Sequence, residues 1–318
     1  MLKLVQAQTD DLLSFENTKA LRLLFAFMIL AHHTYQQTLV FGEYKWFDYL
    51  LRYFGYFGVS AFFFLSGYGL QYSVESKPNY AKALLKKTAG FFMLNAFLVL
   101  LYAVVKSVVG GGNIELKDII LSLTFGHTIV GAGWYLQEII VIYLLLFLCL
   151  KISKKHSTIL FASSIFLLTI ILFLLKFGTY WFISTLSVLS GLAVCKYKTH
   201  VLNVLKENFV LFYASMTLIF IALNFWNFQH PKMITLLGQN LLFPFVVVLP
   251  LYNKVVNMSS LLEKISSLTL EIFLLQGVVF VLLNSMPNIN AIAYVLVAFI
   301  GTIILSYGMK PIFNYILH

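Results

Sequence analysis

Residues 22–33 read Arg22-Leu23-Leu24-Phe25-Ala26-Phe27-Met28-Ile29-Leu30-Ala31-His32-His33. The stretch is an apolar run with a cation at one end and two histidines at the other, which is the composition of a helix core in a bilayer. Burying an ionisable side chain at that depth is costly, so such a residue is a candidate for function. Histidine accepts and returns a proton near neutral pH. The stretch therefore predicts a membrane-spanning helix that carries a proton-transfer group.

The composition extends this interpretation to the whole chain. Of its 318 residues, 60% are hydrophobic, 17% aromatic and 11% charged, with a mean hydropathy of +0.89. A soluble domain does not carry so much apolar surface along its whole length. We therefore expect an all-α, polytopic transmembrane helix bundle in which residues 1–318 form a single integral membrane domain. No cleavable signal peptide is expected, and Cys149 and Cys195 are expected in the core rather than in a disulfide.

Apolar runs long enough to cross a hydrocarbon core, which takes about 20 helical residues, recur ten times. Because lipid cannot satisfy backbone hydrogen bonds, each run is expected to be a helix. The two longer connections are residues 74–87, which are basic, and residues 110–133, which begin Gly110-Gly111-Gly112-Asn113. The ten expected spans are 20–41, 52–73, 88–109, 134–151, 157–175, 178–195, 207–226, 233–251, 267–285 and 291–309.

Lysine and arginine fix the expected orientation. With ten spans, 16 of the 22 lysine and arginine residues fall on the side that holds both termini. The positive-inside rule then makes both termini cytoplasmic. Contact with anionic lipid on that side accounts for most of the net charge of +10, so no nucleic-acid partner is needed. The six cations of the opposite side are Lys45, Arg52, Lys106, Lys117, Lys176 and Lys232.

Arg22 and His33 share one face of the first expected helix. Eleven residues make about three turns, which places the two side chains within about 20° of each other and about 16 Å apart along the axis. Arg22 would bind a phosphate bidentately at the cytoplasmic mouth, and His33 would lie deeper in the bundle. Adjacent histidines diverge too far to hold one metal alone, so no metal site is predicted. Two alternatives stay open: His32 is the active histidine, or the histidine merely hydrogen-bonds to a neighbouring helix.

Glu138 and Glu271 are the acidic residues expected well inside spans. An unpaired carboxylate there is costly, so each should face the interior of the bundle. Glu138 lies about one turn inside the external boundary, where it could hydrogen-bond an acceptor or orient a catalytic histidine. Glu271 lies nearer the cytoplasm, where Arg22 or a lysine of residues 74–87 could pair with it. A purely structural pairing stays an alternative for both.

The second expected helix reads Phe57-Gly58-Val59-Ser60-Ala61-Phe62-Phe63-Phe64-Leu65-Ser66-Gly67-Tyr68. Together with a first helix in which histidine follows arginine by eleven positions, this stretch resembles the acyltransferase family 3 membrane proteins. Further matching stretches follow in order over nearly the whole chain: Trp134-Tyr135-Leu136 with Glu138, then Ser190-Gly191-Leu192, then Ser267–Gln276.

The resemblance implies a ten-helix enzyme of the cell membrane that moves an acyl group, commonly acetyl, from cytoplasmic acyl-CoA to a hydroxyl of a cell-surface carbohydrate. It implies that His33 is the catalytic base and that Arg22 binds or supports the donor. Ser66-Gly67-Tyr68 would belong to the donor site, on a helix that lines the acyl channel. No permanently bound cofactor is implied, because acyl-CoA is a substrate. The acceptor would be a polysaccharide or a lipid-linked glycan, and the polysaccharide synthesis machinery is a candidate partner.

Two positions depart from the family pattern. Where members often carry an Arg-x-x-Arg pair followed by proline, residues 80–90 supply lysines and no proline. Lysine keeps the positive charge of arginine but lacks the guanidinium group that binds a phosphate through two hydrogen bonds. Lys86 and Lys87 are therefore predicted to act as point charges that help Arg22 hold the donor. Gln276 stands where histidine is frequent, and an amide cannot act as a base at neutral pH.

Two rival functions stay open. Ten helices with buried Glu, His and Asn also suit a transporter or flippase for a lipid-linked sugar or a small anion. The lysine-for-arginine departures also suit an accessory subunit of polysaccharide synthesis that has lost activity. The sequence shows no internal repeat and few broken spans, which argues against a transporter. The leading prediction is an acyltransferase, with direct or covalent transfer and acetyl or longer acyl groups as open alternatives.

Overall fold

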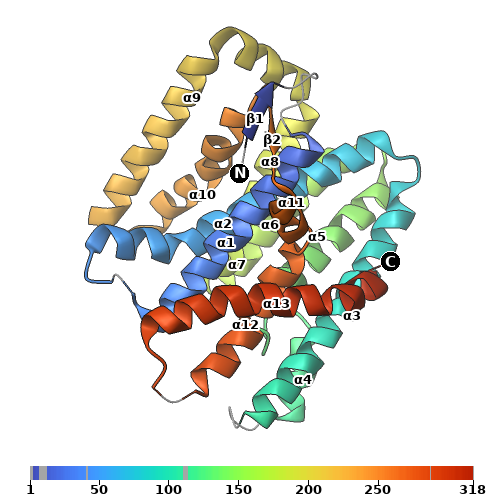
Figure 1. Cartoon of the computed structure of the whole chain (residues 1–318). Helices are drawn as coiled ribbons and strands as arrows, with labels where there is room; N and C mark the ends of the chain where they lie inside the picture. Colours follow the sequence, from blue (N-terminus) through green and yellow to red (C-terminus); the bar gives the residue numbers. More distant parts are fainter. Residues whose placement is uncertain (1–2, 7–12, 41, 110–113, 287, 318) are drawn as a thin grey trace. The chain divides into compact units, whose positions relative to one another are not determined.

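The computed structural model describes residues 3–6, 13–40, 42–109, 114–286 and 288–317. Apart from one small sheet, the described secondary structure is helical (Figure 1). The predicted class is therefore confirmed in its main part. The glycine run Gly110-Gly111-Gly112-Asn113, which was expected to begin the longer external connection, lies outside the described residues.

The chain divides into two compact units. Unit 1 comprises Met1–Ile29, Tyr49–Pro78 and Ile165–Ser267, and unit 2 comprises Leu30–Asp48, Asn79–Ser164 and Leu268–His318. The single domain over residues 1–318 stays a prediction.

Each unit is built mainly from long helices, and three helices contribute residues to both units. The shared helices are α1 (Phe15–Thr38), α2 (Lys45–Ser76) and α6 (Ser157–Leu174). Unit 1 also contains α7 (Thr179–Phe182), α8 (Ser187–Lys196), α9 (Lys198–Gln229), α10 (Met233–Val248), η1 (Leu249–Leu251), α11 (Ser260–Ser266) and the strands β1 (Lys3–Gln6) and β2 (Lys254–Asn257). Unit 2 also contains α3 (Tyr80–Val108), α4 (Leu116–Ser122), α5 (Gly133–Ile152), α12 (Thr269–Asn284) and α13 (Ala291–Leu317).

Several helices are long and apolar enough to cross a membrane. Within the described residues these are six: α3, α5, α6, α9, α10 continued into η1, and α13. The pair α11 and α12, bent by 70°, would make a seventh span. The helices α1 and α2 coincide with the first two expected spans and carry more polar residues. The total of ten spans and the orientation of the termini stay predictions.

The expected continuous helix over 178–195 is wrong. Residues 183–186 separate α7 from α8, and the amide of Ser187 bonds to the carbonyl of Ser184 at 3.0 Å, the three-residue spacing of a tighter turn. The physical cause is side-chain competition for backbone groups. The Thr185 hydroxyl donates to the Trp181 carbonyl at 2.9 Å, and the Ser184 hydroxyl donates to the Tyr56 carbonyl at 3.3 Å.

The expected basic loop over 74–87 is also wrong. The helix α2 continues to Ser76 and α3 begins at Tyr80, which leaves three residues between them. Asn79 takes the left-handed conformation, with φ of 59°, that lets so short a connection turn. Lys86 and Lys87 therefore lie on the first turns of a helix rather than in a loop.

A two-stranded antiparallel sheet was not predicted. Lys3 pairs with Asn257, and Gln6 pairs with Lys254. The side chain of Asn17 on α1 extends the pairing, because its Nδ2 donates to the Lys254 carbonyl at 2.8 Å and its Oδ1 accepts from the Val256 amide at 2.9 Å. Four-residue strands are too short to give a periodic signal, which is why the sequence did not reveal them.

The core of unit 1 is aromatic, and its helices meet at glycines. Phe57 and Phe243 stack with ring centroids 5.0 Å apart, and Phe64 is 1% exposed in the same cluster. A Cβ atom at Gly67 would overlap the carbonyl oxygen of Val188 on α8. The phenylalanine-rich stretch therefore packs α2 against α10, and Gly67 packs α2 against α8.

A proline in α10 is compensated by hydroxyls from two other helices. Pro244 has no amide hydrogen to give to the carbonyl of Asn240, four residues earlier. The Ser60 hydroxyl donates to that oxygen at 2.6 Å, and the Ser187 hydroxyl lies 3.3 Å from it. Ser60, Ser187 and Asn240 are all fully buried. The two hydroxyls therefore replace the missing amide donor and lower the cost of the helix break in an apolar surrounding.

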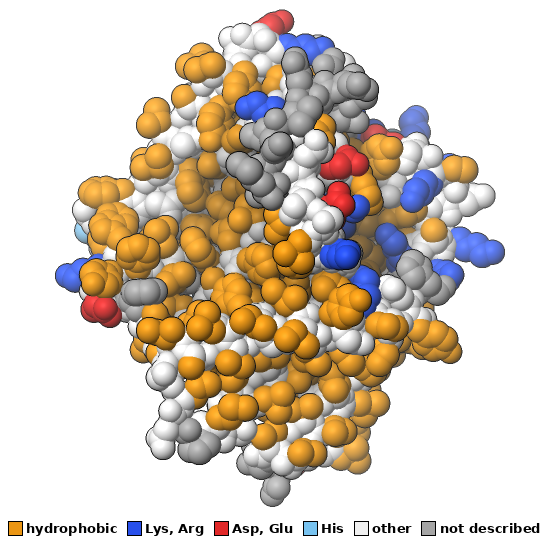
Figure 2. Space-filling view, viewed as in Figure 1, with side chains coloured by type: hydrophobic (Ala, Val, Ile, Leu, Met, Phe, Trp, Pro, Cys, Tyr) orange, Lys and Arg blue, Asp and Glu red, His pale blue; other side chains and the backbone are white. Residues whose placement is uncertain are grey.

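Apolar side chains cover much of the molecular face in Figure 2. In unit 1, Val210 and Leu211 on α9 are 78% and 70% exposed, and in unit 2, Ile304 on α13 is 67% exposed. Soluble proteins seldom expose apolar surface on this scale. The exposed surface of these helices is therefore suited to lipid.

Replacing Gly67 by alanine is expected to destabilise the protein by about 1–3 kcal/mol, because the new methyl group would overlap the α8 backbone. The measurement is the unfolding temperature of the detergent-solubilised protein. Gly69→Ala is the matched control, since a Cβ atom there meets nothing within 4 Å. It should leave the unfolding temperature unchanged or raise it slightly. Equal unfolding temperatures for the two variants would contradict the tight crossing of α2 and α8.

Candidate active site

Unit 2 contains a cavity of about 230 Å³. Four segments that are far apart in the sequence form its wall: the end of α1, the end of α3, the connection before α5, and the second half of α12. Its lining residues are His33, Gln37, Tyr102, Lys106, Ile129, Gly131, Ala132, Gln276, Gly277, Phe280, Val281 and Asn284.

His33 lies in the cavity wall and is partly exposed. Its Nδ1 lies 3.0 Å from Oε1 of Gln36, one turn further along α1. His32 is 8% exposed and is not among the lining residues, and its ring centroid lies 5.0 Å from that of His33 with the planes at 60°. The two histidines that the sequence left as alternatives therefore have different surroundings, and His33 is the one at the cavity.

Amide side chains form a chain of hydrogen bonds along one wall. The Asn284 Nδ2 donates to Oε1 of Gln37 at 2.9 Å, and the Asn284 Oδ1 accepts from the Tyr294 hydroxyl at 2.9 Å. These bonds connect α1, α12 and α13 within unit 2. The sequence analysis did not identify Gln37 or Asn284, because an amide in an apolar run becomes informative only when its neighbours in space are known.

Gln276 occupies the position where the family often has histidine. It is 2% exposed, and its Nε2 donates to the Phe273 carbonyl at 2.7 Å. Its Oε1 has no hydrogen-bond partner among the described residues. A buried acceptor without a partner is costly, so this oxygen is suited to a hydroxyl donor from a ligand in the cavity.

Tyr102 and Gly277 bring α3 and α12 into close contact beside Gln276. The Tyr102 hydroxyl donates to the Leu274 carbonyl at 3.1 Å. A Cβ atom at Gly277 would overlap that hydroxyl, so a larger residue at this position would displace Tyr102. The glycine therefore allows the close contact of α3 and α12 in the cavity wall.

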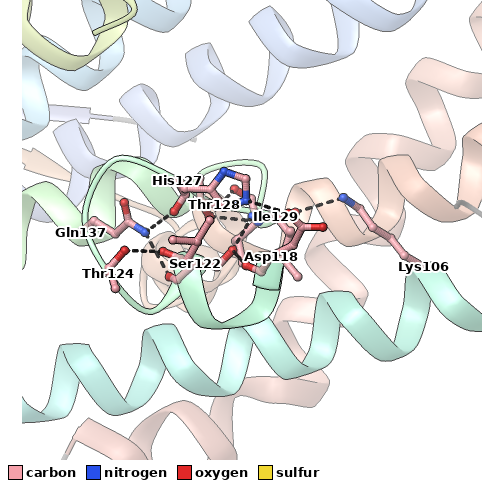
Figure 3. A network of polar contacts seen from close by, with 10 residues as sticks. Lys106, Asp118, Ser122, Thr124, His127, Thr128, Ile129 and Gln137 are labelled. Carbon is pink, nitrogen blue, oxygen red and sulfur yellow. Dashed lines mark hydrogen bonds and ion pairs between the residues drawn. The ribbon is translucent and has the colours of Figure 1, made fainter. Parts of the chain in front are cut away.

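The connection that forms the third wall is held by the buried amide of Gln137 (Figure 3). The Gln137 Nε2 donates to the carbonyls of Ser122 and His127 at 3.0 and 2.6 Å, and its Oε1 accepts from the Gly126 amide at 3.2 Å. The Ser122 hydroxyl in turn accepts from the Ile129 amide at 3.0 Å. One side chain on α5 thus fixes the backbone that leads to the cavity.

Lys106 reaches the same connection from the other side. Its Nζ donates to the Ile129 carbonyl at 3.2 Å (Figure 3). Asp118, the acidic residue of α4, pairs instead with Nε2 of His127 at 3.6 Å. Among the described residues, Lys106 forms no ion pair, so its charge is available at the cavity.

The other predicted site residues lie elsewhere. Glu138 is fully buried on α5, next to Gln137, and is not among the residues that line this cavity. Its catalytic role stays a prediction. Arg22 is exposed on the part of α1 that belongs to unit 1, and Lys86 and Lys87 are exposed on α3 in unit 2.

The predicted partners of Glu271 are wrong. Its Oε1 lies 2.9 Å from Nζ of Lys310 on α13, and Glu271 itself is 1% exposed. The pairing with Arg22 or with a lysine of the expected basic loop was inferred from position along the membrane alone. The packing of α12 against α13 brings Lys310 beside Glu271, and the pair neutralises a buried carboxylate.

Within the described residues, no group of three His, Cys, Asp or Glu side chains could hold a metal ion. The cavity therefore offers proton transfer at an imidazole, hydrogen bonding from amides, one ammonium group and an aromatic wall. The apolar helices make the chain a multi-pass membrane protein.

The family comparison names the enzyme class. The family model described as an acyltransferase domain, that of acyltransferase family 3, matches residues 17–310. The match covers nearly the whole chain, so the protein belongs to this family and is an acyltransferase. The resemblance found in the sequence is thereby confirmed, and the transporter alternative is set aside. A search of the curated proteins and a search of the solved structures found no match.

Replacing Gln137 by leucine is expected to loosen the cavity wall. The substitution keeps the size of the side chain and leaves two carbonyls and one amide without their partner, at a cost of about 1–2 kcal/mol. Backbone amides of residues 123–132 should then exchange with solvent deuterium about 5–30 times faster.

Thr124→Val is the control for this experiment, because it removes an exposed hydroxyl bond to the Leu121 carbonyl in the same segment. Its amides beyond residue 125 should keep their protection. Unchanged protection in Gln137→Leu would show that the segment is held by other contacts.

Proposed function

We propose that the protein is an O-acyltransferase of the cell membrane that moves an acyl group, most simply acetyl, from cytoplasmic acyl-CoA to a hydroxyl of a surface polysaccharide or a lipid-linked glycan. The observation that carries the proposal is the position of His33. His33 puts an imidazole, which can act as a base, in the wall of a cavity whose other polar groups can bind hydroxyls. Family membership supports the acyl transfer itself.

The contact between His33 and Gln36 favours the tautomer that a base needs. An amide oxygen accepts and does not donate, so the Nδ1 that lies 3.0 Å from Gln36 Oε1 carries the proton. The lone pair is then on Nε2. A general base held in this way can take a proton from a hydroxyl bound in the cavity.

The transfer step balances with this one base. His33 Nε2 takes the proton of the acceptor hydroxyl as its oxygen attacks the thioester carbonyl, and a C–O bond forms. The C–S bond then breaks, and the imidazolium returns the proton to the departing thiolate of CoA. The products are the acyl ester and free CoA, and His33 ends neutral. Lys106 and the Gln276 amide are placed to bind the acceptor during this step.

The donor would be held from the cytoplasmic side. Arg22 and His33 lie eleven residues apart on α1, about 16 Å along its axis, and a pantetheine arm is an extended chain suited to such a span. The exposed guanidinium of Arg22 suits the phosphates of CoA. The contribution of Lys86 and Lys87, which are exposed in unit 2, stays a prediction. Ser66, Gly67 and Tyr68 stay candidates for the donor site, although Gly67 is covered by α8.

The acceptor would reach the cavity from the external side. With both termini cytoplasmic, the C-terminal ends of α1, α3 and α12 point outward, and the cavity is lined by residues from these ends. Phe280 in its wall stacks on Tyr294 at 14°, which gives an aromatic face of the kind that packs against a sugar ring. A glycan hydroxyl is therefore the proposed nucleophile.

His33→Gln is expected to lower the rate of acyl transfer by about 100–10,000-fold, the usual contribution of a general base. The assay is transfer of label from acetyl-CoA to a surface glycan extract by the purified protein, which excludes any role of a membrane gradient. His32→Gln on the neighbouring position is the matched control and should keep most of the activity. If His33→Gln remains folded and active, or if His32→Gln is the inactive variant, His33 is not the base.

Arg22→Gln is expected to raise the KM for acyl-CoA about 10-fold or more, because a charge-assisted hydrogen bond to phosphate is lost. The KM for the acceptor should not change, since that substrate enters from the other side. Steady-state kinetics with each substrate varied in turn separate the two constants. Lys264→Gln, which removes an exposed cation from α11, should leave both constants unchanged, and an unaltered donor KM in Arg22→Gln would remove Arg22 from the donor site.

A further inference from the structure

The charge of the cavity in unit 2 is one-sided. Among its lining residues are one lysine and one histidine, with no aspartate or glutamate. The remaining polar lining consists of amide and hydroxyl side chains and backbone groups. A neutral sugar needs no cation at such a site, so the position of Lys106 calls for an explanation.

Lys106 is fixed at the cavity without being neutralised. Its side chain is partly buried in the last turn of α3, and one of its three N–H donors is used by the Ile129 carbonyl at 3.2 Å. Two donors remain. The acidic residue on the adjoining segment, Asp118, is paired with His127 at 3.6 Å.

The expected topology makes this cation unusual. Lys106 is one of only six lysine and arginine residues placed on the external side, where the positive-inside rule disfavours them. A structural account is that the ammonium group fastens the loop and complements the carbonyl end of α3. That account explains the bond to Ile129 and does not explain why the lysine faces the cavity that holds His33.

We infer that the acceptor of this enzyme is anionic, and that Lys106 selects it by binding a carboxylate or phosphate group of the glycan. The inference rests on the proposed function for the identity of the ligand as an acceptor. Lys106 acts as a specificity-determining residue: its ammonium group binds the anion, Gln276 and Asn284 bind hydroxyls, and Phe280 packs against the ring. A substrate bound in this way presents another hydroxyl to His33 in the same cavity.

The test measures binding without any donor, using the purified full-length chain and saturation-transfer NMR with three probes: glucose, glucuronate and glucose 1-phosphate. Both anions should bind about 10-fold more tightly than glucose, as expected for one charge-assisted contact. A preference for glucuronate over glucose 1-phosphate, or the reverse, identifies which anionic group the site takes. Equal binding of the three probes, or no binding of either anion, would overturn the inference.

Variants separate charge from structure. Lys106→Gln keeps a donor for the loop and should abolish the preference for the anions, whereas Lys106→Arg should retain it. Lys117→Gln removes an exposed lysine from α4, outside the cavity, and should change nothing. If Lys106→Gln keeps the full preference, or if Lys117→Gln loses it, Lys106 is not the selecting residue.

The result is independent of acyl transfer. The binding measurement contains no acyl donor and no chemical step, so it reports the affinity for the probe alone. If the protein prefers the anions but transfers no acetyl group from acetyl-CoA, the proposed function is wrong and the anion site at Lys106 is retained. If the protein transfers the acetyl group but shows no preference for the anions, the proposed function is retained and the inference about Lys106 is wrong.

Discussion

Within lipid every buried polar group must find its partner inside the protein, and the fold of this chain follows from that constraint. Helices satisfy most of the backbone, and specific side chains meet two of the exceptions. The carbonyl that Pro244 leaves without a donor is met by Ser60 and Ser187 from two other helices. The edge of β2 is met by the Asn17 amide. At these two places a polar side chain lies where the regular pattern of backbone bonding breaks.

The same constraint explains the construction of the cavity. The segment between α4 and α5 is irregular and would expose carbonyls and amides at the edge of the bundle, but Gln137 binds three of them at once. Because these bonds hold the segment in place, Ile129 and its neighbours can serve as a wall of the cavity. Gln137 lies beside Glu138, the residue that the sequence singled out. The side chain that holds the segment before α5 is therefore the Gln137 amide, which neighbours the Glu138 carboxylate in the sequence.

Apolar run length predicted the helices well because a bilayer sets the length of a spanning helix directly. The predictions failed where side chains compete with the backbone or where a helix extends into water. Ser184 and Thr185 break the expected 178–195 helix. Lys86 and Lys87 were assigned to a loop because charged residues mark the limit of a membrane span. They lie on α3 because a helix can continue beyond that limit. The strands β1 and β2, each four residues long, gave no periodic signal.

Of the candidate site, the sequence predicted His33 but not the residues that surround it in the cavity. His33 was identifiable because the cost of burying an imidazole is visible in the sequence, whereas Gln37, Lys106 and Asn284 become related only through the packing of α1, α3 and α12. The partner of Glu271 was missed for the same reason, since Lys310 lies 39 positions away on the antiparallel helix.

The substitution at Gln276 bears on how the proposed proton transfer is organised. A second histidine facing the first could share the work, with one base accepting the proton of the hydroxyl and the other protonating the thiolate. Glutamine can do neither, and its Nε2 is already committed to the Phe273 carbonyl. Tyr102 likewise gives its proton to a backbone oxygen. On the proposed mechanism His33 must therefore perform both proton transfers. The attacking hydroxyl and the departing sulfur must then approach the same imidazole nitrogen in turn. The hydroxyl would come from the external side of the membrane and the sulfur from the cytoplasmic side.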